Sequence, residues 1–318
     1  MDNELLRLSQ LALGEIEGFA DALRLSQIMR PAIRKSMDDE WTAARTFAPN
    51  LIIYHPKCLG SCHVAEALHI PAVMSLPIYT PTVAFPVPFM PSIRLGSTRL
   101  NAWFNRFTFR LGLRASTMYR GVVNDFRVKT LGQRALGRSA DTLVRSDGMP
   151  VPILYSYSPS VLPIPADFPS HVHVTGYWFL DRSSDWQPTT DLVRFLEGGP
   201  PPVYVGFGSM SGRRAEQRAK VVVEALRVSG QRGVLASGWG ALKAVDLPPN
   251  VVMVDAVPHD WVFSQVAAVV HHGGAGTTAA GLRAGRPMVI CPFLADQPFW
   301  GRVVCQRGVG PKPIPERG

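Results

Sequence analysis

The sequence predicts an α/β protein with two domains, each built around a parallel sheet. Three observations support this fold class. Apolar runs of strand type alternate with helical segments through the second half of the chain, and a β-α-β pattern occurs in the first half. A glycine-rich turn at 271–278 joins an apolar strand directly to a helix. The length of 318 residues is also sufficient for two domains.

The first half is predicted to form a partial domain over residues 1–180. Prolines and aromatic residues at 77–92 exclude regular structure there and predict a long loop. The expected elements, in order, are a helical segment at 1–48, a strand at 51–54, a helix at 63–68, a strand at 71–74, the loop at 77–92, a basic helical region, and strands at 153–155 and 172–174.

The second half is predicted to form a nearly complete domain over residues 203–318. Residues 181–202 are polar and rich in proline and glycine, which is typical of an interdomain linker. The expected elements are strands at 203–207, 233–236, 251–254, 266–270 and 288–290, with helices at 215–228 and from 277 onward. Such alternation gives a parallel sheet with helices on both faces, and ligands of these sheets bind at the carboxyl ends of the strands.

The formal net charge of +9 comes from one segment. Between residues 94 and 138 there are ten basic residues and a single acid, Asp125, so the remainder of the chain is electrically balanced. A positive net charge alone suggests a nucleic-acid binder, but this charge is confined to one element and no nucleic-acid motif accompanies it. No nucleic-acid partner is therefore expected.

The same basic segment has the periodicity of an amphipathic helix. Apolar side chains recur at helical spacing and the arginines mostly fall between them: Leu100, Trp103, Phe104, Phe107 and Leu111 against Arg99, Arg106, Arg110 and Arg114. In globular proteins such an aromatic face more often enters the core and leaves the arginines in solvent. The alternative is peripheral contact of residues 94–138 with an anionic membrane surface.

Composition limits the remaining classes. No run of 18 uninterrupted apolar residues is present, and the acidic start of the chain is unlike a secretory signal. The four cysteines, Cys58, Cys62, Cys291 and Cys305, are too few for a disulfide framework and lack zinc-ligand spacing. A cytoplasmic protein is expected, placed on the membrane surface if the basic helix makes that contact.

The most informative motif is the glycine-rich loop that follows the strand at 266–270. Its glycines allow positive φ and close approach of a ligand to the backbone. The unpaired N–H groups and the positive dipole end of the following helix favour an anion such as a diphosphate. The predicted anion site comprises His272, Gly273, Gly274, Ala275, Gly276 and Thr277.

Two further motifs follow strands of the same sheet. Asp296 and Gln297 come after the strand at 288–290, and a carboxylate beside a carboxamide can bind vicinal sugar hydroxyls. A helix N-cap is the structural alternative for Asp296. Ser209 lies in the turn after the strand at 203–207 and can donate to a phosphate, although this turn lacks the third glycine of a dinucleotide fingerprint.

In this order and near this spacing, the three motifs resemble the nucleotide-sugar domain of GT-B glycosyltransferases of the UDP-glycosyltransferase type. The stretch 257–301 and the approach to the linker at 174–178 are especially similar to the sterol 3β-glucosyltransferase branch. The resemblance implies a GT-B fold with two Rossmann-like domains. It implies inverting transfer of a hexose, expected to be glucose, from a nucleotide sugar such as UDP-glucose to a hydroxyl of a sterol or other lipid-like acceptor. It implies no cofactor, and the absence of an Asp-x-Asp motif means that no metal is required.

The resemblance also assigns roles to individual residues. It implies that Ser209, His272, Gly274 and Thr277 hold the diphosphate, that Asp296 and Gln297 hold the sugar, and that the backbone at Val257 faces the base. Ala280 occupies the position where many plant relatives carry a ribose-binding glutamate, so that partner is missing. Trp239 and Trp261 are aromatic candidates for stacking on the base, although a core position is the more frequent role of tryptophan.

The catalytic base is not assigned. Relatives place a His or Asp in a glycine-rich turn after their first strand, and residues 1–48 contain no such turn. The chain is therefore expected to be truncated at both ends, with an incomplete N-terminal domain and the base upstream of Met1. His55, His63 and His69 are expected to be structural. Two alternatives stay open: a fragment that at most binds a nucleotide sugar, and a transferase acting on a polyketide or other small aglycone.

Overall fold

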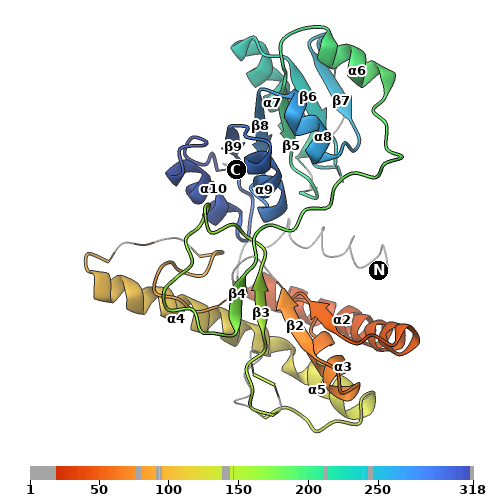
Figure 1. Cartoon of the computed structure of the whole chain (residues 1–318), viewed down its shortest axis with the longest axis vertical. Helices are drawn as coiled ribbons and strands as arrows, with labels where there is room; N and C mark the ends of the chain where they lie inside the picture. The colour runs from red at the N-terminus through yellow and green to blue at the C-terminus, as the bar shows by residue number, and fades with distance from the viewer. Residues whose placement is uncertain are drawn as a thin grey trace. The chain divides into compact units, whose positions relative to one another are not determined.

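The structure, a computed structural model, describes residues 19–75, 80–90, 93, 95–137, 144–145, 147–210, 214–238, 240–242 and 246–315, without the side chains of 19–26 and 113–116. It divides into two compact units, Met1–Gly176 and Tyr177–Gly318. Each unit has its own parallel sheet (Figure 1). Among the described residues, no helix combines the length and the apolarity that crossing a membrane requires.

Unit 1 is built around a sheet in which the strands follow one another in chain order, β1-β2-β3-β4, all parallel. Its elements are α2 (Phe19–Phe47), β1 (Ile52–Tyr54), α3 (Ser61–Ala67), β2 (Ala72–Ser75), α4 (Thr98–Ser116), the 3₁₀ turn η1 (Thr117–Tyr119), α5 (Arg120–Lys129), β3 (Ile153–Tyr155) and β4 (Val172–Val174). All of the strands predicted for this half are confirmed. The part of the predicted helical segment before Phe19 lies outside the described residues.

The core of unit 1 joins α2, α3 and α5. Met37, Val64 and Phe126 come from these three helices and are almost fully buried against one another. Arg127, on the next position of α5, is also buried, and its Nη1 donates to Glu66 Oε2 of α3 at 2.9 Å. A buried guanidinium requires such a partner, because an unpaired charge would be strongly destabilising. The ion pair therefore fixes α5 against α3.

Helix α4 does not have the orientation that its sequence pattern favours. Its buried residues are Asn105, Thr108 and Phe109, whereas four members of its apolar row, Leu100, Trp103, Phe107 and Leu111, are exposed. Asn105 Nδ2 donates to the carbonyl of Val83 at 2.8 Å, and Thr108 Oγ1 accepts from the amide of Val87 at 2.9 Å. The prediction that the aromatic face enters the core is therefore wrong, because the proline-rich loop needs these polar partners for its backbone.

Unit 2 has the sheet order β7-β6-β5-β8-β9, again all parallel, so its first strand is central. Its elements are α6 (Thr190–Glu197), β5 (Val203–Gly206), α7 (Ala215–Ser229), β6 (Gly233–Ala236), β7 (Val251–Val254), α8 (His259–Val262), the 3₁₀ turn η2 (Phe263–Gln265), β8 (Ala268–His271), α9 (Ala275–Arg283), β9 (Met288–Ile290) and α10 (Gln297–Gln306). The strand-helix alternation predicted for this half is confirmed.

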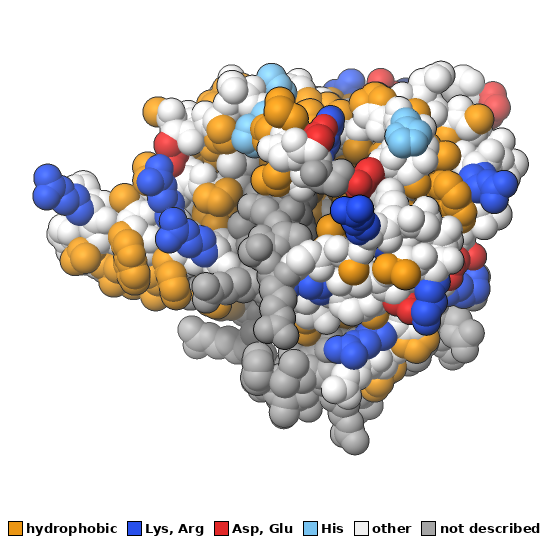
Figure 2. Space-filling model, turned by 90° about the horizontal axis from the view of Figure 1, so that it is seen from below, with side chains coloured by type: hydrophobic (Ala, Val, Ile, Leu, Met, Phe, Trp, Pro, Cys, Tyr) orange, Lys and Arg blue, Asp and Glu red, His pale blue; other side chains and the backbone are white. Residues whose placement is uncertain are grey.

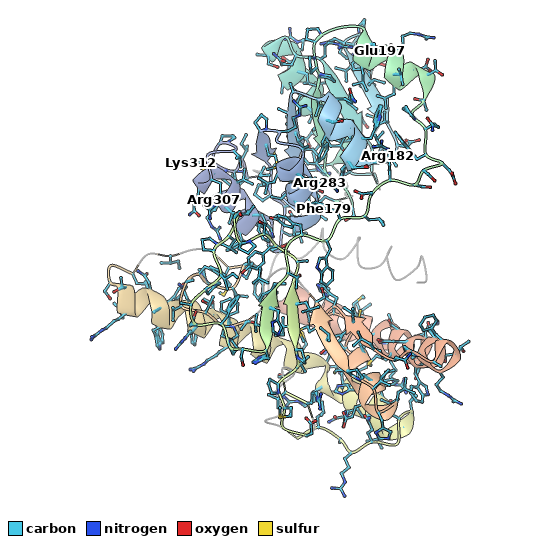
Figure 3. All side chains as sticks on the ribbon, in the orientation of Figure 1. Phe179, Arg182, Glu197, Arg283, Arg307 and Lys312 are labelled. Carbon is cyan, nitrogen blue, oxygen red and sulfur yellow. The ribbon has the colours of Figure 1, made fainter. Side chains whose placement is uncertain are left out.

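The segment predicted as a linker, 181–202, belongs to unit 2. It contains α6, and Leu192 of that helix is buried in the same hydrophobic cluster as Tyr204 of β5. Residues before α6 also make contacts with α9 of unit 2. Arg283 of α9 stacks over the ring of Phe179 at 4.5 Å and donates to Asp181 at 2.7 Å (Figure 3). The polar composition of this segment predicts a linker and gives no indication of these contacts.

Candidate functional site

The candidate site lies at the carboxyl edge of the unit 2 sheet. β5 and β8 are neighbours, with Gly206 paired to His271, and the strand order reverses between them. Ligands of open α/β sheets bind outside the carboxyl ends of the strands at this reversal point. The loops that carry Ser209 and His272 leave from these two strands, and the loop that carries Asp296 leaves from β9, the neighbour of β8.

Contacts between these three loops bring the predicted residues together. The ring of His272 lies beside Gly208, in the loop after β5. Gln297 Nε2 donates to the sulfur of Met210 at 3.4 Å, and the rings of Phe207 and Phe293 meet edge to face at 5.5 Å. The loops after β5, β8 and β9 therefore form one continuous surface.

Gly273 is required by geometry. Its φ is +90°, and a Cβ at this position would lie 2.7 Å from Ile290 Cγ2 and 3.0 Å from the carbonyl oxygen of Gln297. Its amide donates to Nδ1 of His271 at 3.1 Å. His271 is fully buried, and burial lowers its pKa to about 3, so its ring is neutral and accepts this hydrogen bond.

His272 is held between two glycines. A Cβ at Gly274 would lie 2.5 Å from its Nε2, and a Cβ at Gly208 would lie 3.2 Å from its Cε1. Burial lowers the pKa of His272, the carboxylate of Asp296 opposes that shift, and His259 adds to it. Among the described residues, its Nδ1 has no hydrogen-bond partner. The lowered pKa keeps the ring neutral near pH 7, and the unpartnered Nδ1 is itself buried and does not face solvent.

The N-terminus of α9 completes the anion site. Gly274 is the N-cap residue, and among the described residues no side-chain capping hydrogen bond is made at this end of the helix. Thr278 turns back to donate to the carbonyl of Gly274 at 3.0 Å and is buried. Thr277 is only half buried and Gly276 is exposed. This arrangement suits an anion at the first amides of α9, with the Thr277 hydroxyl beside them, and the anion site stays a prediction.

The turn after β9 is strained, and its two polar residues differ in what they offer. Ala295 has φ of +56°, a conformation that costs energy for a residue with a side chain. Asp296 is the N-cap of α10 but makes no side-chain capping bond. Its Oδ2 instead accepts from the indole of Trp300 at 2.9 Å, which leaves Oδ1 for a ligand. Backbone strain of this kind is frequent at functional sites.

Gln297 is turned inward, which differs from its predicted role. Its side chain is 4% exposed, and its Oε1 accepts from the amides of Phe293 and Leu294 at 2.7 and 3.0 Å. Both ends of the carboxamide are therefore occupied by the protein. In this conformation Gln297 shapes the turn that presents Asp296, and does not itself face a ligand.

The remaining predicted residues are distributed as follows. Ser209 is exposed in the loop after β5, and Val257 is half buried in the loop after β7. Trp261 packs against Trp186 with ring centroids 5.2 Å apart, which supports its core role. Ala280 also borders the core, and Trp239 lies outside the described residues.

Two residues that the sequence did not single out support the site. Arg218 of α7 donates to the carbonyls of Met210 and Ala241 at 2.9 and 2.8 Å, and it lies over the ring of Phe293. It therefore holds the loops after β5, β6 and β9 together. His259 stacks on Phe263 at 4.6 Å and brings the loop after β7 back over the sheet. An isolated arginine in a helix carries no sequence signal for such a role.

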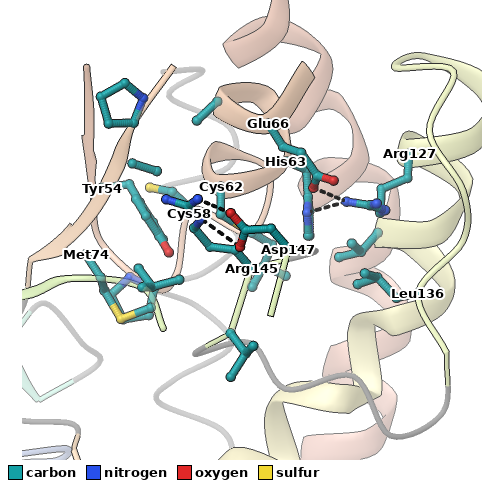
Figure 4. Close-up of a pocket in the computed structure, with 18 of the residues that line it drawn as sticks. Tyr54, Cys58, Cys62, His63, Glu66, Met74, Arg127, Leu136, Arg145 and Asp147 are labelled. Atoms are coloured by element: carbon teal, nitrogen blue, oxygen red, sulfur yellow. Dashed lines mark hydrogen bonds and ion pairs between the residues drawn. The ribbon is translucent and has the colours of Figure 1, made fainter. Parts of the chain in front are cut away.

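Unit 1 contains a separate cavity of about 840 Å³ beside α3 and α5 (Figure 4). Its wall includes His63, and Arg127 Nη1 lies 2.8 Å from Nδ1 of that ring. Burial, together with the positive Arg127, lowers the pKa of His63 to about 4. The cavity also contains Cys58, Cys62 and the Tyr54 hydroxyl. The ring of His63 is therefore neutral near pH 7, and Arg127 contacts both this ring and the carboxylate of Glu66. The structural role expected for His63 stays a prediction.

The sequence has relatives among the curated proteins. Residues 239–317 match the family described as erythromycin biosynthesis protein CIII-like, C-terminal domain. The chain is 42% identical over 273 residues to sterol 3-beta-glucosyltransferase UGT80A2 of Arabidopsis thaliana, an alignment that covers 85% of this chain and 41% of the relative. It is 38% identical over 299 residues to a sterol 3-beta-glucosyltransferase of Neosartorya fischeri, covering 90% of this chain and 20% of the relative. The chain thus spans less than half the length of these relatives.

Solved structures with a similar fold are glycosyltransferases. The glycotransferase of kitacinnamycin has a TM-score of 0.60 at 18% identity, over 95% of this chain and 71% of its own. The glycosyltransferase SnogD from Streptomyces nogalater has a TM-score of 0.53 at 19% identity, over 96% of this chain and 70% of its own. The predicted GT-B fold class and the resemblance to the sterol 3β-glucosyltransferase branch are both confirmed. The roles of single residues stay predictions.

Proposed function

We propose, from the similarity of this chain to the sterol 3β-glucosyltransferases and from the geometry of unit 2, that the protein transfers a hexose from a nucleotide sugar to a hydroxyl group of a lipid-like acceptor. The donor is UDP-glucose or a close analogue, and the acceptor is a sterol. One observation carries the proposal: His272, the open N-terminus of α9 and Asp296 converge at the strand-order reversal of one sheet.

The donor diphosphate binds at the N-terminus of α9 in this proposal. The amides of Ala275, Gly276 and Thr277 point at it, and the Thr277 hydroxyl and exposed Ser209 add hydrogen bonds. The helix dipole and the neutral ring of His272 stabilise the charge that develops on the leaving diphosphate. These groups supply the stabilisation without a metal ion, so no cofactor is required.

The hexose binds at the turn after β9. Asp296 Oδ1 accepts hydrogen bonds from sugar hydroxyls, while Trp300 fixes the carboxylate through Oδ2. Gln297 acts through the backbone of this turn. The acceptor hydroxyl then gives its proton to a general base, to which no residue of this chain is assigned, and its oxygen attacks the anomeric carbon. The bond from that carbon to the diphosphate oxygen breaks, its electron pair stays on the diphosphate, and the configuration inverts. The nucleotide base lies against the backbone at Val257, in the loop after β7.

A lipid-like acceptor is favoured over a polyketide aglycone by the sequence comparison. The relatives at 38–42% identity are sterol 3-beta-glucosyltransferases, whereas the glycotransferase of kitacinnamycin and SnogD share the fold at below 20% identity. We place the protein in the cytoplasm, where its four free cysteines stay reduced, in peripheral contact with a membrane surface through residues 94–138. Such contact gives access to an acceptor dissolved in the bilayer.

The proposal is tested by donor binding and by turnover measured separately. Calorimetry with UDP-glucose and dTDP-glucose reports binding, and incubation of UDP-glucose with cyclodextrin-solubilised cholesterol reports transfer. We expect His272→Ala with Asp296→Ala to weaken UDP-glucose binding about tenfold or more. His173→Ala with Asp191→Ala, two exposed positions, is the matched control.

Each outcome decides one part of the proposal. Unchanged binding in the double variant would show that the site is wrong. Binding without turnover on any sterol would favour the nucleotide-sugar-binding fragment. Turnover on a polyketide aglycone but not on sterols would reject the lipid acceptor. Loss of donor binding in excess EDTA would reject the metal-free site.

A further inference from the structure

Helix α4 exposes an apolar row that the part of the chain described by the structure leaves uncovered. Leu100, Trp103, Phe107 and Leu111 are 52%, 61%, 43% and 46% exposed. The rings of Trp103 and Phe107 stack at 5.3 Å and 8°. These residues recur at helical spacing, so they form one stripe along the helix. An exposed stripe of this size marks an interaction surface more often than chance exposure.

The orientation of the stripe is fixed by hydrogen bonds on the other side of α4. Asn105 and Thr108 face inward and bind the backbone of the loop at 80–90, as described above. Phe109 is buried between them. Rotation of α4 to bury the apolar row would remove both polar partners from that backbone. The row therefore stays outside, because the loop depends on the opposite face.

Arginines border the apolar row along one side. Arg99, Arg106 and Arg110 are all exposed, and Figure 2 shows the basic side chains beside the hydrophobic row on the helix that projects at the left. Both aromatic and arginine side chains line a hollow of about 310 Å³. Its lining residues are Val83, Ala102, Trp103, Arg106, Phe107 and Arg110. Guanidinium groups next to aromatic rings suit an anionic headgroup above an apolar layer.

The basic residues of α5 are not part of this surface. Arg127 is buried against Glu66, and Lys129 pairs with Asp125 at 2.5 Å. The described arginines of α4 thus face outward. On α5, Arg127 is bound to α3, and Lys129 is exposed but paired within its own helix. Arg94 and Arg138 lie outside the described residues, as does the side chain of Arg114.

We propose that α4 docks on an anionic lipid surface, with its apolar row inserted at the headgroup boundary and Arg99 and Arg110 on lipid phosphates. This refines the proposed membrane contact, which rests on the proposed function, to one face of one helix. The helix lies in the plane of the interface. Arg106 contributes less, because it also pairs with Asp167 at 3.1 Å. A nucleic acid fits the arginines but leaves the apolar row uncovered, so the lipid surface is favoured.

Vesicle flotation of the 318-residue chain tests the docking without any donor or acceptor. The probes are neutral phosphatidylcholine vesicles and vesicles containing phosphatidylserine. We expect preferential binding to the anionic vesicles. Trp103→Ser with Phe107→Ser is expected to lower partitioning about tenfold or more on the anionic vesicles. Arg99→Gln with Arg110→Gln is expected to lower anionic binding about fivefold for each arginine and to leave neutral binding unchanged.

Matched variants on α7 and α6 provide the controls. Val221→Ser with Val228→Ser removes two exposed apolar side chains from unit 2, and Arg194→Gln with Arg227→Gln removes two exposed charges. These variants should float like the original chain, and melting curves should confirm that all variants are folded. Equal flotation of the α4 variants and the controls would overturn the proposal. So would a concentration-dependent dimer, seen by sedimentation, that the α4 apolar variant abolishes.

Transferase activity separates this proposal from the proposed function. The α4 variants should retain transfer to cyclodextrin-solubilised sterol and lose it with sterol in anionic vesicles. Loss of activity with the solubilised sterol would instead identify the row as an acceptor surface and overturn the docking proposal. A chain that floats as expected but transfers no hexose would leave the docking supported and reject the proposed function.

Discussion

The ring of His272 lies where a side chain on Gly274 would have to go, since a Cβ there would be 2.5 Å from Nε2. Gly274 is also the N-cap of α9, so one residue both leaves room for the imidazole and begins the anion-binding helix. Glycine is therefore needed at position 274 because a side chain there would collide with the imidazole of His272. Its φ of −60° is one that any residue adopts.

We expect Gly274→Ala to weaken UDP-glucose binding about tenfold, because the added methyl displaces His272 from the anion site. Calorimetry of the purified variant measures the change. Gly121→Ala is the matched control, because a Cβ at that position meets nothing within 4 Å. If Gly274→Ala binds the donor as the original chain does while Gly121→Ala behaves normally, the ring does not need its present position.

A second prediction concerns the hydrogen bond between Trp300 and Asp296. We expect Trp300→Phe to lower affinity for UDP-glucose while affinity for UDP changes little, because the indole orients the carboxylate that contacts the hexose. A neutral-to-charged hydrogen bond of this kind contributes about 2 kcal/mol, which corresponds to an effect of up to about thirtyfold. Calorimetry with the two ligands gives the ratio.

Trp300 is almost fully buried, so its variant also needs a stability control. Asp296→Asn keeps the packing and serves that purpose. Both variants should show the same selective loss, and the double variant should lose no more than either one. Parallel losses for UDP and UDP-glucose would mean that the pair supports the fold of the loop and not the sugar.

The positions of the strands and of the main site residues followed from simple patterns. His272 was predictable because it comes directly after an apolar strand, and Asp296 because it lies in the loop that follows the next strand. Parallel strands end at one edge of the sheet. Arg218 was not predictable, because it acts on carbonyl oxygens from loops that are separated in sequence. Gln297 was predicted to face the sugar, but its two backbone partners lie in the preceding four residues and turn it inward.

The sequence pattern also could not predict whether the apolar row of α4 faces the core or the solvent. Helical spacing of Trp103 and Phe107 predicts a stripe but not which neighbour covers it. The deciding contacts are those of Asn105 and Thr108 with the loop at 80–90, which depend on tertiary structure. Polar residues that satisfy a buried backbone can thus reverse the face that hydrophobicity alone would bury.

Leu192 provides a test of the boundary between the units. We expect Leu192→Ala to lower the free energy of unfolding of unit 2 by about 2–4 kcal/mol, because the side chain is 2% exposed in the core beneath β5. Leu180→Ala is the matched control, because that side chain is 98% exposed. Chemical denaturation followed by tryptophan fluorescence measures both. Equal free energies of unfolding for Leu192→Ala and Leu180→Ala would indicate that residues 190–197 are part of a linker, as the sequence predicts, and not of the unit 2 core.

His63 predicts how the stability of unit 1 depends on pH. Its folded pKa is about 4, lowered mainly by burial and then by Arg127, against 6.5 for the free side chain. Between these values the unfolded chain binds more protons than the folded chain, so the free energy of unfolding falls as pH decreases from 6.5 toward 4. At pH 5 the loss is about 2 kcal/mol relative to pH 7.

Replacement by an uncharged residue isolates this contribution from those of other titrating groups. His63→Gln keeps an acceptor for Arg127 and removes the titration, so its stability should fall less between pH 7 and pH 5 than that of the original chain. His173→Gln, an exposed position in the same unit, should retain the full loss. The measurement is urea denaturation of all three proteins at both pH values. An equal loss in the original chain and in His63→Gln would show that His63 protonates in the folded state as readily as in the unfolded state. The neutral ring inferred beside Arg127 would then be incorrect.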